Sequence, residues 1–375
     1  MRRELERIEI PGEHEARARA WRVLSSAFAE REPVAQRPAR RLVPILVAVG
    51  VVALVAAAVS PPGRAVFHAI RETVGVEQAQ PALFSLPAPG RLLVASDDGV
   101  WIVQADGSKR RLGSYAGASW SPHGRYVVAT RRNGLYALTP TGEERWSLAR
   151  PDVRFARWTG TETDTRIAYL TTSRLHVVGG DGRVDGDIGG LPAAARIAPA
   201  WRPGSGFVLA YATTRGRIGA FEAGRGADVW AKPPTSSPPF AQPRRLEWSS
   251  DGKRLLLVTR NKLVLFGTRS AAPLDVRSER SVVDAVFRPG TRDVTVIRRP
   301  GEVSQIVLGE KVIFSTAGEL RGPTWSPDGR WLLVGLPQAD QWVFVRADGR
   351  KIVAVSSVSA QFRTRTFPRV EGWSS

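Results

Sequence analysis

The sequence predicts an all-β protein, a seven-bladed β-propeller preceded by a single transmembrane helix and a short cytosolic helix. Three observations support this fold class. An aromatic residue followed by a turn signal and an apolar strand recurs along most of the chain. The recurrence has a period of about 40 residues. A charge-free apolar segment lies near the N-terminus of the 375-residue chain, which is long enough for one large all-β domain.

The repeated unit begins with an aromatic residue, continues through a tight turn and enters an apolar strand. Clear copies are WSPHGRYVVAT, WSSDGKRLLLVT and WSPDGRWLLVG, and a looser copy is FRPGTRDVTVI. This period, with four strand-length segments per unit, is typical of a β-propeller blade and not of a β-sandwich. The aromatic residues that begin the copies are Trp120, Trp158, Trp201, Trp248, Phe287 and Trp325.

The copy around Trp325 shows how one unit forms four strands. Residues 320–325 form a first strand, and the SPDG turn follows because Pro fixes one backbone angle while Gly adopts the left-handed conformation. The second and third strands are residues 330–336 and 341–347, and an Asp-Gly hairpin turn leads to a fourth strand. A four-stranded sheet cannot bury both faces alone, so the recurring ring is expected to fill the space between neighbouring blades.

The two ends of the repeat region are predicted to complete one blade together. Residues 91–113 supply a second, third and fourth strand but lack a first strand, whereas FPRVEGW supplies a first strand that ends at Trp373. Pairing them makes Trp373 the seventh repeat anchor and closes the ring through the C-terminal strand. Closure removes the exposed sheet edges that an open array would leave.

The motif W-S-P-D-G-R followed by apolar residues resembles the repeat of TolB-type propellers, also called WD40-like β-propeller repeats. The resemblance is close in three copies, loose in the others, and covers residues 91–375. It implies a bacterial cell-envelope protein with this fold. Members of the family include periplasmic scaffolds, lipoprotein sensors and non-catalytic parts of peptidases, so the resemblance implies no particular activity.

Residues 42–60, LVPILVAVGVVALVAAAVS, form an apolar segment without a charged side chain. As a helix it spans roughly 28 Å, close to the thickness of the hydrocarbon core of a bilayer. The preceding flank is rich in Arg and the following flank is not, so the N-terminus is predicted to be cytoplasmic and the propeller extracytoplasmic. The long leading segment favours a retained signal anchor over a cleaved signal peptide, which places the protein in the cell membrane as a single-pass protein.

Four regions are therefore expected along the chain. Residues 1–41 are a cytosolic segment, 42–60 the transmembrane helix, 61–90 a juxtamembrane helix and linker, and 91–375 the extracytoplasmic propeller. In the cytosolic segment apolar residues recur at three and four within residues 13–31, which gives one apolar helix face. Such a face binds a partner or lies along the membrane without one.

The residue types and motifs of the sequence exclude several kinds of catalytic and metal site. The absence of Cys excludes disulfides, thiolate metal sites and a Cys nucleophile. The four His residues are scattered along the sequence, and neither a Gly-x-Ser-x-Gly nucleophile motif nor a phosphate- or dinucleotide-binding fingerprint occurs. We therefore expect no catalytic residues, metal, cofactor or small-molecule substrate, and a binding protein in place of an enzyme.

Arginine residues gather in the segments that join the second and third strands of several units, namely TRRNG, TTRGR, TRNK and IRRPG. In a propeller these loops share one face with the inter-blade connections, and converging Arg side chains suit carboxylates, phosphates or lipid headgroups. The alternative is that an Arg-rich chain of net charge +19 places Arg in every exposed loop. The residues of this predicted anion- or partner-binding face are Arg131, Arg132, Arg215, Arg217, Arg260, Arg298 and Arg299.

The expected function is that of a membrane-anchored module that binds a protein partner or senses a ligand. A sharper form is a relay to a cytosolic partner such as a sigma factor. It resembles membrane-bound anti-sigma regulators in architecture only, because residues 1–41 lack a zinc-binding His-Cys-Cys signature. Nucleic acid is a poor candidate for an extracytoplasmic domain. The alternatives are a cell-envelope scaffold and a carbohydrate-binding lectin, the latter suggested by five Trp outside the repeat position: Trp101, Trp146, Trp230, Trp331 and Trp342.

Overall fold

The computed structural model describes residues 77–80, 85–172, 174–183, 186–192, 197–204, 206–224, 227–230 and 237–375. All of them belong to the larger of two compact units, Ala48–Ser375. The expected cytosolic segment 1–41, the transmembrane helix 42–60 and the juxtamembrane helix that follows it lie outside these residues. Within the described ranges no helix is long and apolar enough to cross a membrane.

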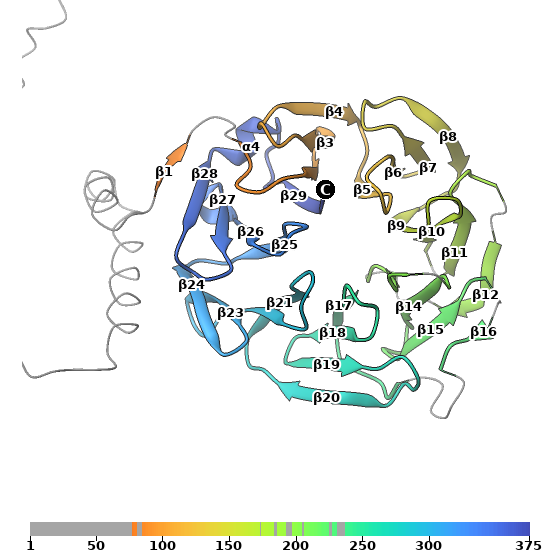
Figure 1. The fold of residues 1–375 in the computed structure, drawn as a ribbon. Coiled ribbons are helices and arrows are strands. Elements are labelled where there is room, and N and C mark those ends of the chain that lie inside the picture. The colour runs from red at the N-terminus through yellow and green to blue at the C-terminus, as the bar shows by residue number, and fades with distance from the viewer. Residues whose placement is uncertain are drawn as a thin grey trace, which may run out of the picture. The chain divides into compact units, whose positions relative to one another are not determined.

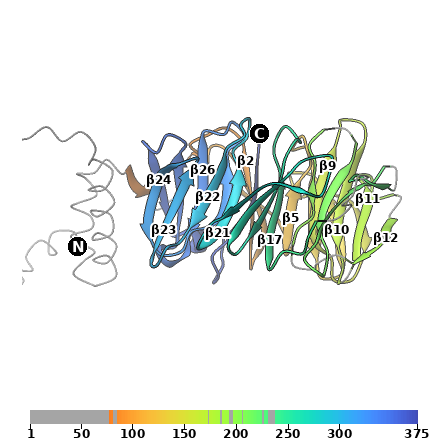
Figure 2. The ribbon, with the colours of Figure 1, turned by 90° about the horizontal axis from the view of Figure 1, so that it is seen from below.

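Seven antiparallel sheets, counted over the described residues, stand around a ring as blades (Figures 1 and 2). In each blade the strands follow one another from the centre of the ring outward. Blade 1 consists of β29 (Arg369–Ser374), β2 (Arg91–Ser96), β3 (Gly99–Val103) and β4 (Lys109–Gly113), and blade 2 of β5 (Gly117–Trp120), β6 (Val127–Arg131), β7 (Gly134–Leu138) and β8 (Glu144–Ala149). Blade 3 consists of β9 (Arg154–Gly160), β10 (Thr165–Leu170), β11 (Arg174–Gly179) and β12 (Gly186–Pro192), and blade 4 of β13 (Ala200–Trp201), β14 (Val208–Ala212), β15 (Ile218–Glu222) and β16 (Ala227–Asp228).

The remaining three blades repeat the arrangement with longer inner strands than blade 4. Blade 5 consists of β17 (Pro243–Trp248), β18 (Leu255–Thr259), β19 (Lys262–Phe266) and β20 (Pro273–Ser278), and blade 6 of β21 (Val282–Phe287), β22 (Val294–Arg298), β23 (Val303–Leu308) and β24 (Lys311–Ala317). Blade 7 consists of β25 (Arg321–Trp325), β26 (Trp331–Leu336), β27 (Gln341–Arg346) and β28 (Ile352–Ser356). The predicted seven-bladed all-β ring is confirmed.

Blade 1 joins the two ends of the ring. Strand β29 pairs antiparallel with β2, with Trp373 opposite Leu92 and Arg369 opposite Ala95. The Trp373 indole N–H donates to the Pro89 carbonyl oxygen at 3.2 Å, and its ring meets the Phe344 ring of blade 7 edge-on at 5.9 Å. The C-terminal strand therefore closes the ring, as the sequence predicted.

The middle strands of the blades form the core. All five residues of β3, β14 and β18 are buried, and so are all six of β26. Both faces of a blade pack against its neighbours, which is why these strands are continuous apolar runs without alternation. The outermost strands are more polar and partly exposed, as in β8 and β20.

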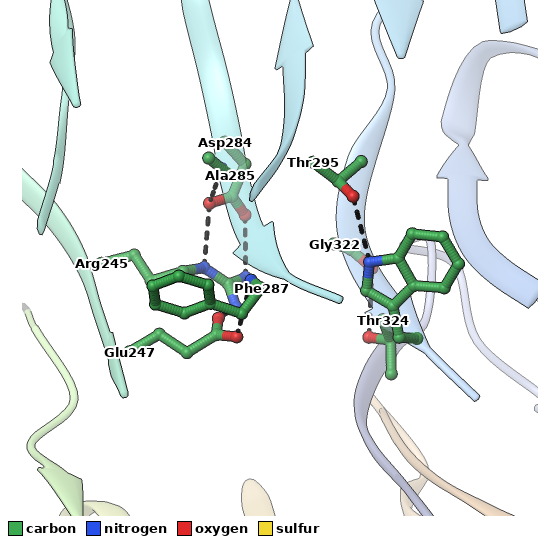
Figure 3. Close-up of polar contacts among 9 residues, drawn as sticks. Arg245, Glu247, Asp284, Ala285, Phe287, Thr295, Gly322 and Thr324 are labelled. Carbon is green, nitrogen blue, oxygen red and sulfur yellow. Dashed lines mark hydrogen bonds and ion pairs between the residues drawn. The ribbon is translucent and has the colours of Figure 1, made fainter. Parts of the chain in front are cut away.

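The repeat anchors lie at the ends of the inner strands and reach toward the preceding blade. The Trp201 indole N–H of blade 4 donates to the Arg157 carbonyl oxygen of blade 3 at 2.8 Å. The Trp248 indole N–H of blade 5 donates to the Ala200 carbonyl oxygen of blade 4 at 3.1 Å. The Trp325 indole N–H of blade 7 donates to Thr295 Oγ1 of blade 6 at 3.2 Å. Figure 3 shows the hydrogen bond to Thr295. In these three anchors one contact both packs the ring against the preceding blade and satisfies the indole N–H. The indole N–H groups of Trp120 and Trp158 are buried without a hydrogen-bond partner among the described residues.

A second contact joins some neighbouring blades through an arginine. In three junctions of the described ring, an Arg donates to the carbonyl oxygen of the turn glycine in the next blade and lies over that blade's anchor Trp. The donor–acceptor pairs are Arg91 with Gly124 (2.9 Å), Arg202 with Gly252 (2.7 Å) and Arg288 with Gly329 (2.8 Å). The same guanidinium groups lie 4.8, 5.7 and 5.6 Å from the ring centres of Trp120, Trp248 and Trp325.

Three elements have no counterpart in the sequence prediction. Strand β1 (Glu77–Gln80), expected to be linker, pairs parallel with β28 as a fifth strand on blade 7. Helix α4 (Val358–Gln361) forms in the connection from blade 7 to blade 1. It is followed by the fully buried Phe362, whose ring contacts Trp101 and Trp342 at 5.9 and 5.2 Å. A short 3₁₀ helix (Pro337–Ala339) joins β26 to β27.

Replacing Gly329 by Ala should destabilise the protein more than replacing Gly309 by Ala. Both glycines have similar positive φ angles, +64° and +62°, so both substitutions carry the cost of the left-handed conformation, about 1–2 kcal/mol. A Cβ at residue 329 would also lie 2.8 Å from the Pro289 carbonyl oxygen of blade 6, whereas nothing lies within 4 Å at residue 309. We expect an additional loss of about 1–3 kcal/mol for Gly329→Ala, measured by urea unfolding. Equal losses would show that the turn glycine does not serve the contact between blades.

Candidate functional site

Partly buried charged side chains lie on four of the innermost strands, β9, β17, β21 and β29. These strands surround the middle of the ring (Figure 1). They arise from alternation along each strand. In β17 Leu246 and Trp248 are buried between blades, while Arg245 and Glu247 alternate with them and are only partly buried. We call the resulting set the inner charge cluster, and its members are Arg157, Arg245, Glu247, Asp284 and Glu371.

The strongest interaction in the inner charge cluster joins blades 5 and 6. Arg245 donates to Asp284 through two parallel hydrogen bonds, Nε to Oδ1 at 2.9 Å and Nη2 to Oδ2 at 2.8 Å (Figure 3). Its Nη1 lies 3.5 Å from Glu247 Oε2. The Phe287 backbone N–H donates to Glu247 Oε1 at 3.0 Å. This bidentate arrangement fixes both the distance and the orientation of the two blades.

Partial burial changes the pKa values of Arg245 and Glu247. The side chains of Arg245, Glu247 and Asp284 are 32%, 28% and 18% exposed. Burial raises the pKa of the Glu247 carboxyl to about 7, although Arg245 and the Phe287 N–H oppose the rise. Burial lowers the pKa of Arg245, but the attraction of Asp284 and Glu247 outweighs it and the pKa is raised.

Arg157 on β9 has a different environment. Its Nη1 donates to the Ala156 carbonyl oxygen at 3.0 Å, and within the described part of the chain no carboxylate lies within ion-pair distance of it. Burial lowers the pKa of Arg157, against the attraction of Glu371. Glu371, 15% exposed, pairs instead with Arg369 at 3.4 Å. Arg157 therefore keeps guanidinium donors available for an anionic group.

The predicted arginines are located in the second-to-third-strand loops, and these loops share a face with the inter-blade connections. The Asp152 N–H of one connection donates to the Arg132 carbonyl oxygen at 2.7 Å, and the Thr366 N–H of another donates to Asp97 Oδ2 at 3.1 Å. We call this the loop face. The opposite face carries the first-to-second and third-to-fourth-strand turns and is called the turn face.

The structure divides the seven predicted arginines into two groups. Four are held by neighbouring groups of the protein. Arg131 donates to the Ser114 carbonyl oxygen and lies over the rings of Tyr115 and Tyr136, and Arg217 donates to the Ser237 carbonyl oxygen. Arg298 binds Glu279 and Gln305, and Arg299 forms an ion pair with Glu302. The side chains of Arg132, Arg215 and Arg260 are exposed and make no hydrogen bond or ion pair with other described residues. Of the seven predicted arginines, these three present free guanidinium groups on the loop face.

Side chains that could bind a metal do not gather in the described part of the chain. No group of three or more His, Asp or Glu is arranged there to hold an ion. Of the two described His, His123 is exposed in a turn, and His176 stacks on Tyr169 at 5.0 Å.

Sequence reasoning did not identify the inner charge cluster. The sequence does carry a signal for it. A charged residue that alternates with buried apolar residues along a strand must point away from the apolar interface between blades. Arg157 and Glu247 directly precede their anchors Trp158 and Trp248. The pairing of Arg245 with Asp284, however, depends on how adjacent blades meet.

No protein-family model matches the chain, and no characterised protein matches it by sequence. Solved structures match its fold. The chain is similar to the C-terminal WD40 domain of Sif2 with a TM-score of 0.54 at 12% identity, over 76% of this chain and 88% of that one. It is similar to a chain of the mitotic checkpoint complex with a TM-score of 0.51 at 12% identity, over 68% and 81%. Hsv2 of Kluyveromyces lactis gives 0.50 at 10% identity, over 71% and 93%.

The ring is a seven-bladed β-propeller, and its fold is similar to that of the WD40 domain of Sif2. At these identities the similarity concerns the fold, and function has to be argued from the sites of this chain.

Stability should fall between pH 4.5 and pH 7, and the Glu247→Gln variant should lack most of this fall. The folded-state pKa of Glu247, about 7, lies above its ordinary value of 4.5. The stabilisation from its bound proton is therefore complete below pH 4.5 and is lost as pH rises through 7, by on the order of 2 kcal/mol. Urea midpoints at pH 5 and pH 8 measure the difference. The control is Glu310→Gln, a change at an exposed turn residue, which should show the same difference between the two urea midpoints as wild type. If Glu247→Gln also showed the wild-type difference, the fall in stability would not come from Glu247.

Proposed function

We propose that the chain is a single-pass membrane protein whose propeller binds a protein partner or senses a ligand outside the cytoplasm. The observation that carries this proposal is the loop face, where Arg132, Arg215 and Arg260 project from blades 2, 4 and 5 without a hydrogen bond or ion pair to another described residue. Side chains that stay charged and unpaired on a rigid ring are available for carboxylates or phosphates of a partner. We infer binding and not catalysis as the role of the domain.

The fold is compatible with this role. One structure with the same fold is a chain of the mitotic checkpoint complex, a protein assembly. A closed ring holds its loops at fixed positions, so binding costs little reorganisation of the backbone. Arg157, half-buried on an inner strand with donors to spare, would serve an acidic group that reaches the inner strands.

The Arg132→Ser, Arg215→Ser, Arg260→Ser triple variant should lose the partner of the propeller. A matched control changes three exposed arginines of the turn face to Ser, namely Arg292, Arg330 and Arg350. Both variants lose the same charge, so a general charge effect would weaken both equally. We expect at least tenfold lower recovery of cross-linked partner for the loop-face variant only, quantified by mass spectrometry after pull-down from solubilised membranes. Equal recovery for the two variants would exclude the loop face as the binding surface.

The membrane anchor is proposed for residues 42–60, with support from their uninterrupted apolar character and from the Arg-rich flank before them. The resemblance of the repeats to TolB-type propellers of the bacterial envelope supports the same orientation. In this arrangement residues 1–41 are cytoplasmic and the propeller is extracytoplasmic.

Single cysteines should report this topology, because the chain has no Cys of its own. A membrane-impermeant maleimide should label Glu310→Cys in intact cells, since Glu310 is exposed in a turn of the propeller. Ser25→Cys should be labelled only after lysis. The reverse labelling pattern, or labelling of both sites in intact cells, would contradict the proposed orientation.

A finer form of the proposal is a relay in which residues 13–31 bind a cytosolic regulator such as a sigma factor. Its support is the apolar helix face predicted in that segment. In the pull-down described above, removal of residues 1–35 should then eliminate one cytosolic protein while the partner of the loop face is retained. If the set of recovered proteins is unchanged, the segment serves anchoring alone.

A further inference from the structure

A pocket lies between blades 2 and 3 on the turn face. Its volume is about 390 Å³, within the range of small-molecule sites, about 300–1,000 Å³. Blade 2 contributes the turn between β5 and β6 and part of β8, and blade 3 contributes Trp158, the turn between β9 and β10 and the turn after β11. The pocket is on the opposite face from the predicted arginines, and the loop-face proposal does not use it.

Aromatic rings line this pocket. Tyr126, 38% exposed, stacks on Trp158 with ring centres 6.1 Å apart and 18° between the planes. Trp146 is half-buried, and its indole N–H donates to the Gly180 carbonyl oxygen at 2.9 Å. This bond holds the Trp146 ring in place beside the pocket. The site thus has three aromatic rings, of which Tyr126 is exposed and the two Trp are partly buried.

Trp146 differs in this respect from the other tryptophans outside the repeat position. Trp101, Trp230, Trp331 and Trp342 are at most 9% exposed and belong to the core. They are not available as binding platforms. Of the five residues on which the lectin alternative was based, Trp146 is the one that is only partly buried, and it borders this pocket.

The polar groups around the rings are balanced in charge. Arg125 and Arg145 face Glu162 and Asp181 across the pocket lining, with His123 and the hydroxyls of several Thr beside them. His123, Arg125 and Glu162 are exposed and make no side-chain hydrogen bond or ion pair with other described residues. Asp181 accepts only the Arg183 backbone N–H of its own turn, through Oδ1 at 2.9 Å. Donors and acceptors for a polar ligand are therefore present without an excess of either charge.

We propose that this pocket binds a neutral saccharide. A sugar ring presents an apolar C–H face, which stacks on an aromatic side chain, and an edge of hydroxyl groups, which both donate and accept hydrogen bonds. The exposed Tyr126 supplies the stacking face, and Arg125, Glu162 and Asp181 supply partners for the hydroxyls. The balanced charge of the lining argues against an anion, which would leave two carboxylates facing a like charge.

A second pocket, between blades 6 and 7, shows the contrast. It is lined by Arg288, Arg330 and Arg346 with Asp348 as the single carboxylate, and Trp331 is its one aromatic residue. Trp331 is 9% exposed. This pocket has the wrong charge and no open aromatic face for a neutral sugar, which makes it a suitable control.

The test measures saccharide binding to the full chain in lipid nanodiscs, because alkyl-glycoside detergents would themselves occupy the site. Maltose, cellobiose and chitobiose are titrated by calorimetry, with glucose 6-phosphate as the anionic comparison. We expect at least one neutral disaccharide to bind. Tyr126→Ala should weaken its binding about tenfold and Glu162→Gln about fivefold, whereas Arg330→Ser at the control pocket should leave it unchanged.

The outcomes separate the proposal from its alternatives. Failure of all three neutral disaccharides to bind, binding of glucose 6-phosphate alone, or equal affinity of wild type and the Tyr126 and Glu162 variants would each overturn it. Melting temperatures of the variants identify any loss of folding. If Tyr126→Ala does not fold, Glu162→Gln together with Arg125→Gln, both changes of exposed side chains, decides the question.

Discussion

The contact between the inner strand of one blade and the blade before it is the interaction on which the rest of this structure depends. A four-stranded sheet of this composition has apolar side chains on both faces, so it is stable only when neighbours cover it. The anchor indoles supply the cover at the narrow inner side of the ring, and hydrogen bonds such as Trp201 Nε1 to Arg157 O set the spacing. At three junctions in the described ring the Arg–Gly hydrogen bonds also fix the orientation of one blade relative to the next, because the N–H groups of a guanidinium point in fixed directions.

The number of blades, their strand order and the closing strand could be predicted from the sequence because these features depend on signals that repeat. An aromatic residue, a tight turn that contains Gly and an apolar run predict the same strands in each clear copy. A missing first strand at one end of the repeat region matches an unpaired first strand at the other. The fate of individual arginines could not be predicted in this way. Arg298 is held by Glu279 and Arg131 by Tyr115, and these partners come from inter-blade connections whose path the repeat does not specify.

The inner charge cluster illustrates the same limit. Arg245 and Asp284 lie 39 residues apart and occupy inner strands of adjacent blades. The alternation of apolar and charged residues shows that each side chain points away from the apolar interface between blades. That the two side chains meet depends on the angle and spacing between adjacent blades in the closed ring. Four of the five extra tryptophans proved to be core residues for a related reason. A buried aromatic on a middle strand and one that borders a pocket have similar sequence surroundings, and only neighbouring blades distinguish them.

The pairing of β29 with β2 has a consequence for the timing of folding. The two strands are separated by almost the whole length of the ring, so the backbone groups along one edge of β2 have no partner until β29 has been made. At synthesis rates of about 5–20 residues per second this interval lasts roughly tens of seconds. An open edge of apolar strand is a template for pairing with another copy. The yield of native protein therefore depends on a race between completion of the chain and association of nascent chains, and slower translation of the later blades should favour aggregation even though the finished ring has no open end.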